Sequence, residues 1–175
     1  MMRILVHKIG AFDIHLSRKI SFLAGKRFLD GLMYWISRSG DGYLYGLFAV
    51  AMLTGKIAYG TKMLTAGAIS FAVELGVQKA VKHLVRRERP CLDVGTRYRM
   101  SPPDKFSFPS GHTAGAFLMA TIVGFFYPLW SIALYVWAVL MGFSRIYNGM
   151  HYTTDVIMGC VLGVSTAYLG LGIVM

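Results

Sequence analysis

The sequence predicts an all-α integral membrane helical bundle, with about five transmembrane helices preceded by interfacial amphipathic helices. The 175 residues are 55% apolar, above the roughly 45–50% that is usual in soluble domains. Long apolar runs alternate with short polar breaks, as in multi-pass membrane proteins. The net charge of +10 falls largely beside these runs, which favours lipid headgroups and phosphates over nucleic acid as partners. The length suggests a single domain over residues 1–175.

Residues 1–40 differ from the remainder of the chain. Apolar residues such as Ile9 and Phe12 alternate with basic residues such as Lys8 and Arg18, and no charge-free stretch is long enough to cross a bilayer. This pattern favours amphipathic helices lying on the headgroups over a cleaved targeting signal. The Ser39-Gly40-Asp41-Gly42 break then separates this segment from the transmembrane bundle expected over 41–175.

Five apolar runs follow the break and are expected to be the crossings. They cover residues 42–61, 63–81, 113–127, 128–143 and 156–175. The third and fourth crossings are short, and Tyr127-Pro128 between them predicts a tight turn in an interfacial aromatic belt. Two cysteines do not make a disulfide framework, so Cys91 and Cys160 are expected to be free thiols.

Three polar motifs interrupt the second half of the chain. They are Lys82-(six residues)-Arg89-Pro90, Pro109-Ser110-Gly111-His112, and Ser144-Arg145-(five residues)-His151-(three residues)-Asp155. If the five apolar runs each cross the membrane, the loop over 86–108 and the short loop around Asn148 fall on the same membrane face. The three motifs are therefore expected to meet in one site.

The third motif supplies a candidate nucleophile. His151 and Asp155 are four residues apart, so on a helix they would share one face within hydrogen-bond reach. A carboxylate on one imidazole nitrogen would leave the other nitrogen as a lone-pair nucleophile. A capped helix end with a satisfied histidine is the alternative interpretation. Arg145 either clamps an oxyanion or extends to the membrane interface, and its position alone favours neither role.

The second motif has the features of an anion site at a helix start. Ser110 is a natural N-cap, Gly111 allows a bulky anion to approach the backbone, and the helix N-terminus favours negative charge. His112 on the first turn is a candidate general acid. Taken alone, however, a Ser-Gly pair before an apolar run is most often simply the beginning of a helix.

The first motif places two cations seven residues apart. Lys82 and Arg89 would lie on one helix face if the helix continued to Pro90, and like charges so close call for an anion between them. A positive flank that anchors a membrane helix is the alternative, and Arg86 and Arg87 fit that role. Glu74, earlier in the same crossing, is an intramembrane carboxylate; pairing with Lys79 or Lys82 for structure is favoured over a functional role.

In this order and spacing the three motifs resemble the signature of the type 2 phosphatidic acid phosphatase (PAP2) superfamily, whose pocket is related to that of vanadium haloperoxidases. The motifs cover residues 82–155, and one departure is Thr153, where many relatives carry proline or another small residue. The resemblance implies that His151 attacks phosphorus and forms a phosphohistidine, that Asp155 orients His151, and that His112 protonates the leaving oxygen. It implies phosphate ligands from Lys82, Arg89, Ser110, Gly111 and Arg145, with no metal and no cofactor.

The resemblance implies a bacterial membrane lipid phosphatase, while the substrate stays open among four lipids. These are polyprenyl pyrophosphate, phosphatidylglycerol phosphate, lipid A phosphate and phosphatidic acid. The alternatives are a lipid-to-lipid phosphotransferase, a non-catalytic lipid-phosphate binding or transport protein, and a haloperoxidase using vanadate. A cluster of basic residues suggests a headgroup with more than one anionic centre: Arg86, Arg87, Arg97, Arg99 and Lys105.

The expected location is the bacterial inner membrane, with several crossings. Counting basic residues would put the motif face in the cytoplasm, whereas the resemblance favours a site facing the periplasm. Many of these cations have a separate purpose as phosphate ligands, so the periplasmic orientation is the prediction. The sequence makes no prediction of oligomeric state.

Overall fold

The structure is a computed structural model that describes residues 2–55, 57–90 and 104–175. Within these ranges the chain is helical and contains no strand. The helices are α1 (Met2–Ser21), α2 (Arg27–Arg38), α3 (Tyr43–Thr54), α4 (Gly60–Val85), α6 (Gly111–Phe126), α7 (Pro128–Tyr147) and α8 (Thr153–Val174).

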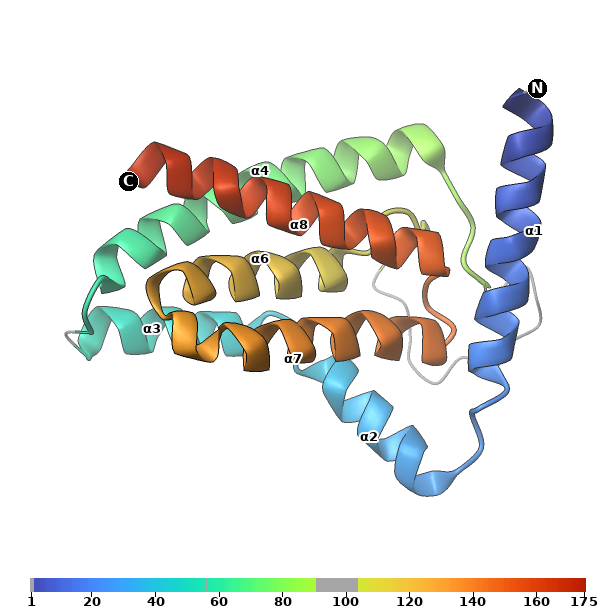
Figure 1. Cartoon of the computed structure of the whole chain (residues 1–175), viewed down its shortest axis with the longest axis horizontal. Helices are drawn as coiled ribbons and strands as arrows, with labels where there is room; N and C mark the ends of the chain where they lie inside the picture. The colour runs from blue at the N-terminus through green and yellow to red at the C-terminus, as the bar shows by residue number, and fades with distance from the viewer. Residues whose placement is uncertain (1, 56, 91–103) are drawn as a thin grey trace.

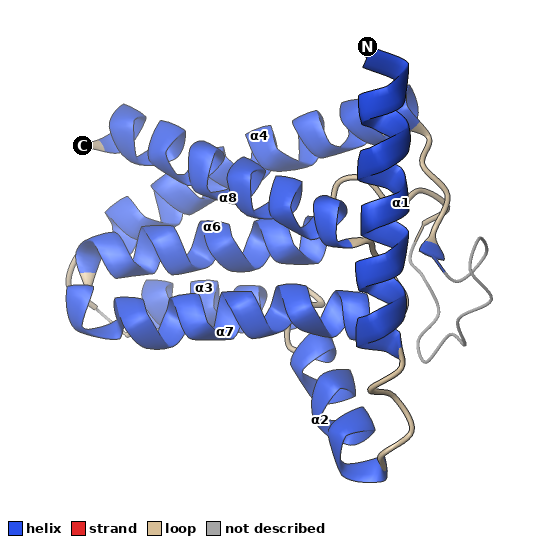
Figure 2. Cartoon of the chain, turned by 45° about the vertical axis from the view of Figure 1, so that its right-hand side comes forward, coloured by secondary structure: helices blue, strands red, loops and turns tan. Residues whose placement is uncertain are grey.

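The bundle is built around α6, which packs against α8, α7 and α4. Helices α3, α4, α6, α7 and α8 run roughly side by side, and α1 crosses one end of them (Figure 1). The same crossing is visible after a 45° turn (Figure 2). Fully buried apolar residues of α6, among them Leu118 and Ile122, form the core with Ala66 of α4 and Leu171 of α8. A second apolar cluster joins α6 to Ala138 of α7.

Small residues let α8 approach α6 closely at the end that carries the motifs. A Cβ on Gly163 would lie 2.1 Å from the carbonyl oxygen of Ala114, and one on Gly159 would lie 2.5 Å from that of Ser110. Only glycine fits such backbone contacts. The close approach allows the Ser110 N–H to donate to the Asp155 carbonyl at 3.0 Å, so the second and third motifs are joined directly through the backbone.

Helices α4, α6, α7 and α8 lie close to the predicted second to fifth crossings, including the turn before Pro128. The first prediction, 42–61, was too long, because α3 ends at Thr54 and residues 60–61 already belong to α4. In the part of the chain that the structure describes, two helices, Pro128–Tyr147 and Thr153–Val174, are long and apolar enough to cross a membrane. The 12 residues of α3 and the 16 of α6 reach only about 18 and 24 Å, short of a hydrocarbon core of roughly 30 Å. Five crossings therefore remain a prediction.

The N-terminal helices expose large apolar side chains, as helices at a membrane surface do. Phe22 and Phe28 are more than four-fifths exposed, and Phe12 and Trp35 about two-thirds. Polar residues on the inner faces of α1 and α2 nevertheless contact the bundle, which their amphipathic pattern did not predict. The interfacial placement of residues 1–40 remains a prediction.

Candidate active site

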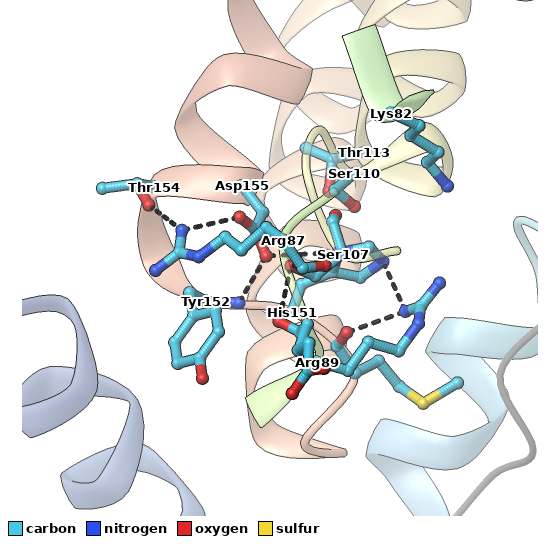
Figure 3. Close-up of polar contacts among 12 residues, drawn as sticks. Lys82, Arg87, Arg89, Ser107, Ser110, Thr113, His151, Tyr152, Thr154 and Asp155 are labelled. Carbon is cyan, nitrogen blue, oxygen red and sulfur yellow. Dashed lines mark hydrogen bonds and ion pairs between the residues drawn. The ribbon is translucent and has the colours of Figure 1, made fainter. Parts of the chain in front are cut away.

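The three motifs meet at one end of the bundle, around a cavity of about 760 Å³. Six of the eight predicted site residues line it: Lys82, Arg89, Gly111, His112, Arg145 and His151. The other two, Ser110 and Asp155, are fully buried behind the wall. Figure 3 shows how side chains from α4, α8 and the connecting loops converge there. The predicted meeting of the three motifs is therefore present in the structure.

His151 has the geometry of a neutral nucleophile. It lies in the connection between α7 and α8 and is 2% exposed. Its Nδ1 is 2.7 Å from the carbonyl oxygen of Ser107, which can only accept, so Nδ1 carries the proton and Nε2 keeps a lone pair. Nε2 lies 3.3 Å from Nη1 of Arg89. Burial and the charges of Arg145 and Arg89 lower the pKa of His151 well below its ordinary value of 6.5.

The predicted hydrogen bond between Asp155 and His151 is replaced by a looser contact. His151 precedes α8, whose N-cap is Tyr152, so the two residues do not share a helix face. The Asp155 Oδ2 atom lies 3.6 Å from Nδ1 of His151 and instead accepts the Tyr152 N–H at 2.8 Å. The carboxylate therefore completes a capping box and remains close enough to attract an imidazolium that forms at His151.

Arg87, which the sequence suggested was a membrane anchor, holds Asp155 instead. Its Nη1 donates to Asp155 Oδ1 at 2.8 Å, and its Nη2 donates to Asp13 Oδ2 at 2.7 Å. The guanidinium stacks 3.9 Å from the ring centroid of Tyr152. Asp13 is 1% exposed and also accepts the Thr154 N–H at 3.1 Å. Helix α1 thus supports the start of α8, a role with no signal in the sequence because charge alone does not identify a partner 74 residues away.

The first motif is assembled by an acidic residue rather than by a continuous helix. Helix α4 ends at Val85, and Arg86 has φ 50°, so Lys82 and Arg89 do not share a helix face as predicted. Instead, Asp104 Oδ2 accepts from Lys82 Nζ at 2.6 Å and Asp104 Oδ1 accepts from Arg89 Nη2 at 2.7 Å. Burial opposes ionisation of Asp104, but these bonds and charges outweigh it and lower its pKa. Asp104 occupies the anion position between the two cations.

Arg145 is a buried cation with free donors. It is 1% exposed, and its Nη1 donates to Ser37 Oγ of α2 at 2.5 Å. Its Nε and Nη2 are buried and have no hydrogen-bond partner among the described residues. Buried polar groups are nearly always paired, so two orphaned guanidinium donors at a cavity indicate a site for an anion. This geometry favours the clamp over the interface anchor.

The second motif begins α6 as predicted, but its backbone is partly occupied. Ser110 is the N-cap of α6 and makes no side-chain cap bond, because its Oγ bonds Thr113 Oγ1 at 2.9 Å. Its N–H is used by Asp155, so it is not available to an anion. The backbone N–H groups of Gly111 and His112 lie in the first helical turn, where no intrahelical acceptor exists. The backbone N–H groups left free for an acceptor are therefore those of Gly111 and His112, and not that of Ser110 as predicted.

His112 is held by a residue from the segment before α3. Its Nε2 lies 2.8 Å from Asp41 Oδ1, and Asp41 Oδ2 accepts from Arg38 Nη1 at 2.6 Å. An ionised carboxylate only accepts hydrogen bonds, so Nε2 is the donor. Burial and the charge of Arg145 lower the pKa of His112 from 6.5 to about 4, and the bond to Asp41 opposes this shift only in part. The negative charge of a bound phosphate would raise this pKa again, towards the range that a general acid needs. In the sequence Asp41 is recognisable only as part of a chain break, so its bond to His112 was not predicted.

The remaining sequence predictions have mixed outcomes. Cys160 is a free thiol as predicted, whereas Cys91, Arg97 and Arg99 lie outside the described residues. Lys105 is exposed and does not line the cavity. The proposed cluster of basic headgroup ligands is therefore supported at neither Lys105 nor Arg87.

The chain is similar in sequence to known proteins. A family model described as the PAP2 superfamily matches residues 44–175. An undecaprenyl-diphosphatase of Sulfolobus acidocaldarius is 31% identical over 83% of this chain and 70% of its own. A lipid A 1-phosphatase of Porphyromonas gingivalis is 34% identical over 79% of this chain but only 28% of its own length.

Two solved structures are similar in fold. Aquifex aeolicus LpxE superposes with a TM-score of 0.78 at 26% identity, covering 90% of this chain and 93% of that one. A transmembrane PAP2-type phosphatidylglycerolphosphate phosphatase of Bacillus subtilis superposes with a TM-score of 0.74 at 27% identity, covering 95% and 86%.

Proposed function

The chain belongs to the PAP2 superfamily and is a phosphoric ester hydrolase, and from this premise we propose that it is a membrane-embedded lipid phosphatase. Its substrate carries a phosphomonoester or a diphosphate on a membrane lipid. The relatives are named for different substrates, among them undecaprenyl diphosphate and lipid A 1-phosphate, so the candidates remain the four lipids of the sequence analysis. The observation that carries the proposal is the cavity in which His151 Nε2 and the unpaired donors of Arg145 lie together.

In the first step His151 Nε2 attacks phosphorus in line with the leaving oxygen. A P–N bond forms while the P–O bond to the lipid breaks, and His112 transfers its proton to the departing oxygen. The hydrogen bond from Nδ1 to the Ser107 carbonyl fixes the imidazole orientation. As His151 becomes cationic, the Asp155 carboxylate 3.6 Å away offsets the new charge.

In the second step water hydrolyses the phosphohistidine. His112, now neutral, accepts a proton from water as the oxygen attacks phosphorus, and the P–N bond breaks. Phosphate leaves, and both histidines return to their starting protonation states. Asp41 holds His112 in place for both transfers.

Three cations neutralise the phosphoryl oxygens in both steps. Lys82 and Arg89 leave Asp104 for the phosphate, and Arg145 contributes its two unpaired donors. Charge on the equatorial oxygens is highest in the transition state, so fixed donors there lower the barrier. These cations supply the neutralisation that a metal ion supplies in other phosphatases.

The proposed location is the bacterial inner membrane, with the cavity opening towards the periplasm. A membrane-impermeant thiol reagent tests the orientation in intact cells. It would be applied to a variant lacking Cys91 and Cys160 and carrying Lys105→Cys, an exposed position at the cavity end. Labelling of intact cells supports the periplasmic orientation, and labelling only after lysis contradicts it.

The test of the proposed function is phosphate release by purified protein in detergent with EDTA, across the four lipids. We expect release from at least one lipid, and its loss in His151→Ala. The matched control is His83→Ala, because His83 is exposed and does not line the cavity. A phosphorylated protein that is stable in alkali and lost in acid would identify the phosphohistidine. A His151→Ala protein that keeps wild-type release would refute the mechanism, and a folded wild-type protein with no release would refute the hydrolase proposal for these lipids.

A further inference from the structure

The cavity continues past the phosphate ligands, between α3, α4 and α6. Beyond Gln78 and Gly111 its wall is formed by Tyr45, Glu74 and Gly115. The proposed phosphatase mechanism uses none of these three residues. Two of them carry polar groups that the described residues leave unsatisfied.

Glu74 is a buried carboxylate without a partner. It is 2% exposed, and its Oε1 has no hydrogen-bond partner among the described residues. Among the described residues Glu74 forms no ion pair with Lys79 or Lys82, so the predicted structural pairing is absent. Lys82 bonds Asp104 instead. A buried polar atom left unpaired costs about 1–3 kcal/mol, so its retention at a cavity wall indicates a ligand that supplies the missing hydrogen.

Tyr45 presents a second unpaired polar atom to the same part of the cavity. Its hydroxyl is buried and has no partner among the described residues. The hydroxyl oxygen would lie 3.5 Å from a Cβ placed on Gly115, so it lies over the helix surface one turn beyond Gly111. A tyrosine hydroxyl both donates and accepts, whereas an ionised carboxylate only accepts.

The two unpaired groups lie at the same depth relative to the phosphate site. Gln78 contacts Gly111, since its Nε2 would lie 1.9 Å from a Cβ placed there. Glu74 is one turn before Gln78 on α4, and Gly115 is one turn after Gly111 on α6, so each step is about 6 Å along its helix. That distance corresponds to the first two or three bonds of the leaving group beyond the phosphoester oxygen.

We propose that Glu74 and Tyr45 form a subsite for a hydroxyl group on the leaving group, close to the phosphate-bearing carbon. Glu74 accepts the hydrogen of this hydroxyl, and Tyr45 donates to its oxygen. The substrate class is a phosphomonoester of a polyol, such as a glycerol or sugar unit, rather than of an unfunctionalised alkyl or prenyl chain. This inference rests on the proposed phosphatase function, because the phosphate defines the position of the leaving group.

The test compares two lipids that differ in one hydroxyl. Lysophosphatidic acid carries a free hydroxyl on the carbon next to the phosphate-bearing carbon, and its 2-deoxy analogue has the same acyl chain and lacks that oxygen. Hydrolysis of both is measured as kcat/KM with wild type, Tyr45→Phe and Glu74→Met. Each variant removes polar atoms and keeps the shape of the side chain.

The control variants remove hydroxyls from similar positions outside the cavity. Ser70→Ala changes α4 one turn from Glu74, on the side that packs against Gly170. Tyr135→Phe removes a hydroxyl that bonds Thr121. A merely structural role for Tyr45 or Glu74 would lower the rates with both lipids together, so the ratio of the two rates is the decisive readout.

We expect the wild type to prefer the hydroxylated lipid by about 10-fold or more, since a site built for a hydroxyl rejects the analogue that lacks it. Tyr45→Phe and Glu74→Met should each reduce this ratio several-fold, and the two controls should leave it unchanged. An unaltered ratio in both variants, or a wild type without preference, would overturn the subsite.

Binding separates failure of the subsite from failure of the phosphatase function. The same two lipids are titrated into His151→Ala protein, with and without Tyr45→Phe, and the Kd values are compared. A hydroxyl preference in binding that Tyr45→Phe removes supports the subsite even if no lipid is hydrolysed. Equal binding of both lipids by His151→Ala overturns it, whatever the turnover results.

Discussion

Replacing Arg145 by methionine should abolish activity without destabilising the protein. The guanidinium is 1% exposed and is tied to the protein through Nη1 to Ser37, while Nε and Nη2 are unpaired among the described residues. If these two donors bind phosphate, their loss should weaken stabilisation of the transition state without removing a hydrogen bond from the unliganded protein. Methionine has a similar unbranched length and no charge.

The substitution should lower kcat but should not lower the free energy of unfolding. Removal of one fixed donor to a developing oxyanion lowers kcat by about 10²–10³, so loss of two donors and the charge should lower it by at least about 10³. On the stability side, the lost hydrogen bond from Arg145 to Ser37 is worth about 1–3 kcal/mol, whereas an incompletely paired buried ion carries a desolvation penalty of several kcal/mol. The free energy of unfolding should therefore hold or rise, with Tm moving by about 2–4 °C per kcal/mol.

The assay is phosphate release and thermal unfolding on the same purified preparation. Arg145→Lys is the matched variant, because it keeps the charge but loses the forked donors, and it should retain more activity than Arg145→Met. Inorganic phosphate should raise the Tm of the wild type and have much less effect on Arg145→Met. Activity within tenfold of wild type, or a Tm several degrees lower, would refute the assignment of Arg145 as a phosphate clamp.

The remaining predictions concern charge at the site. Because the pKa of His151 is depressed, the activity profile should show no loss from its protonation near pH 6.5. Below that pH the unfolded chain binds a proton that the folded protein does not, so the contribution of His151 to stability should fall as the pH falls through 6.5. Denaturant titrations at several pH values check this sign. The Asp104 carboxylate competes with phosphate for Lys82 and Arg89, and Asp104→Asn should weaken that competition by roughly 1 kcal/mol after allowance for solvent screening. The inhibition constant for vanadate should therefore fall about fivefold. Weaker inhibition by vanadate would contradict this. Asp41→Asn should lower kcat by about 10–10² and move the limb that reports the general acid to lower pH, whereas an unchanged profile would show that His112 does not depend on Asp41.

The sequence predicted which residues gather at the cavity better than it predicted their contacts with one another. His151, His112, Arg145, Lys82 and Arg89 all reach the cavity because their motifs flank helices whose apolar periodicity and turns place them at one end. The expected partners were less accurate, since they assumed continuous helices: His151 lies before α8, and α4 ends before Arg89.

The acidic residues show most clearly what the sequence analysis missed. Asp13, Asp41 and Asp104 each bond a cation or a histidine of the site. They lie 74, 71 and 22 residues from those partners, outside any short motif. An isolated aspartate in a loop or on an amphipathic helix has the same local pattern whether it is solvated or paired, so only the folded chain distinguishes them.

The sequence by itself determined the helical class, the positions of most helices and the set of polar residues proposed as nucleophile, acid and phosphate ligands, because apolar periodicity and motif spacing are local properties. Tertiary structure alone decided which carboxylate neutralises which cation, which nitrogen of His151 is free, and which donors of Arg145 remain unpaired. It also placed Tyr45 of α3 beside Glu74 of α4 in the inner part of the cavity. The physical reason is that hydrogen bonds and ion pairs act over a few ångströms, so their partners are set by the packing of helices that are distant in the chain.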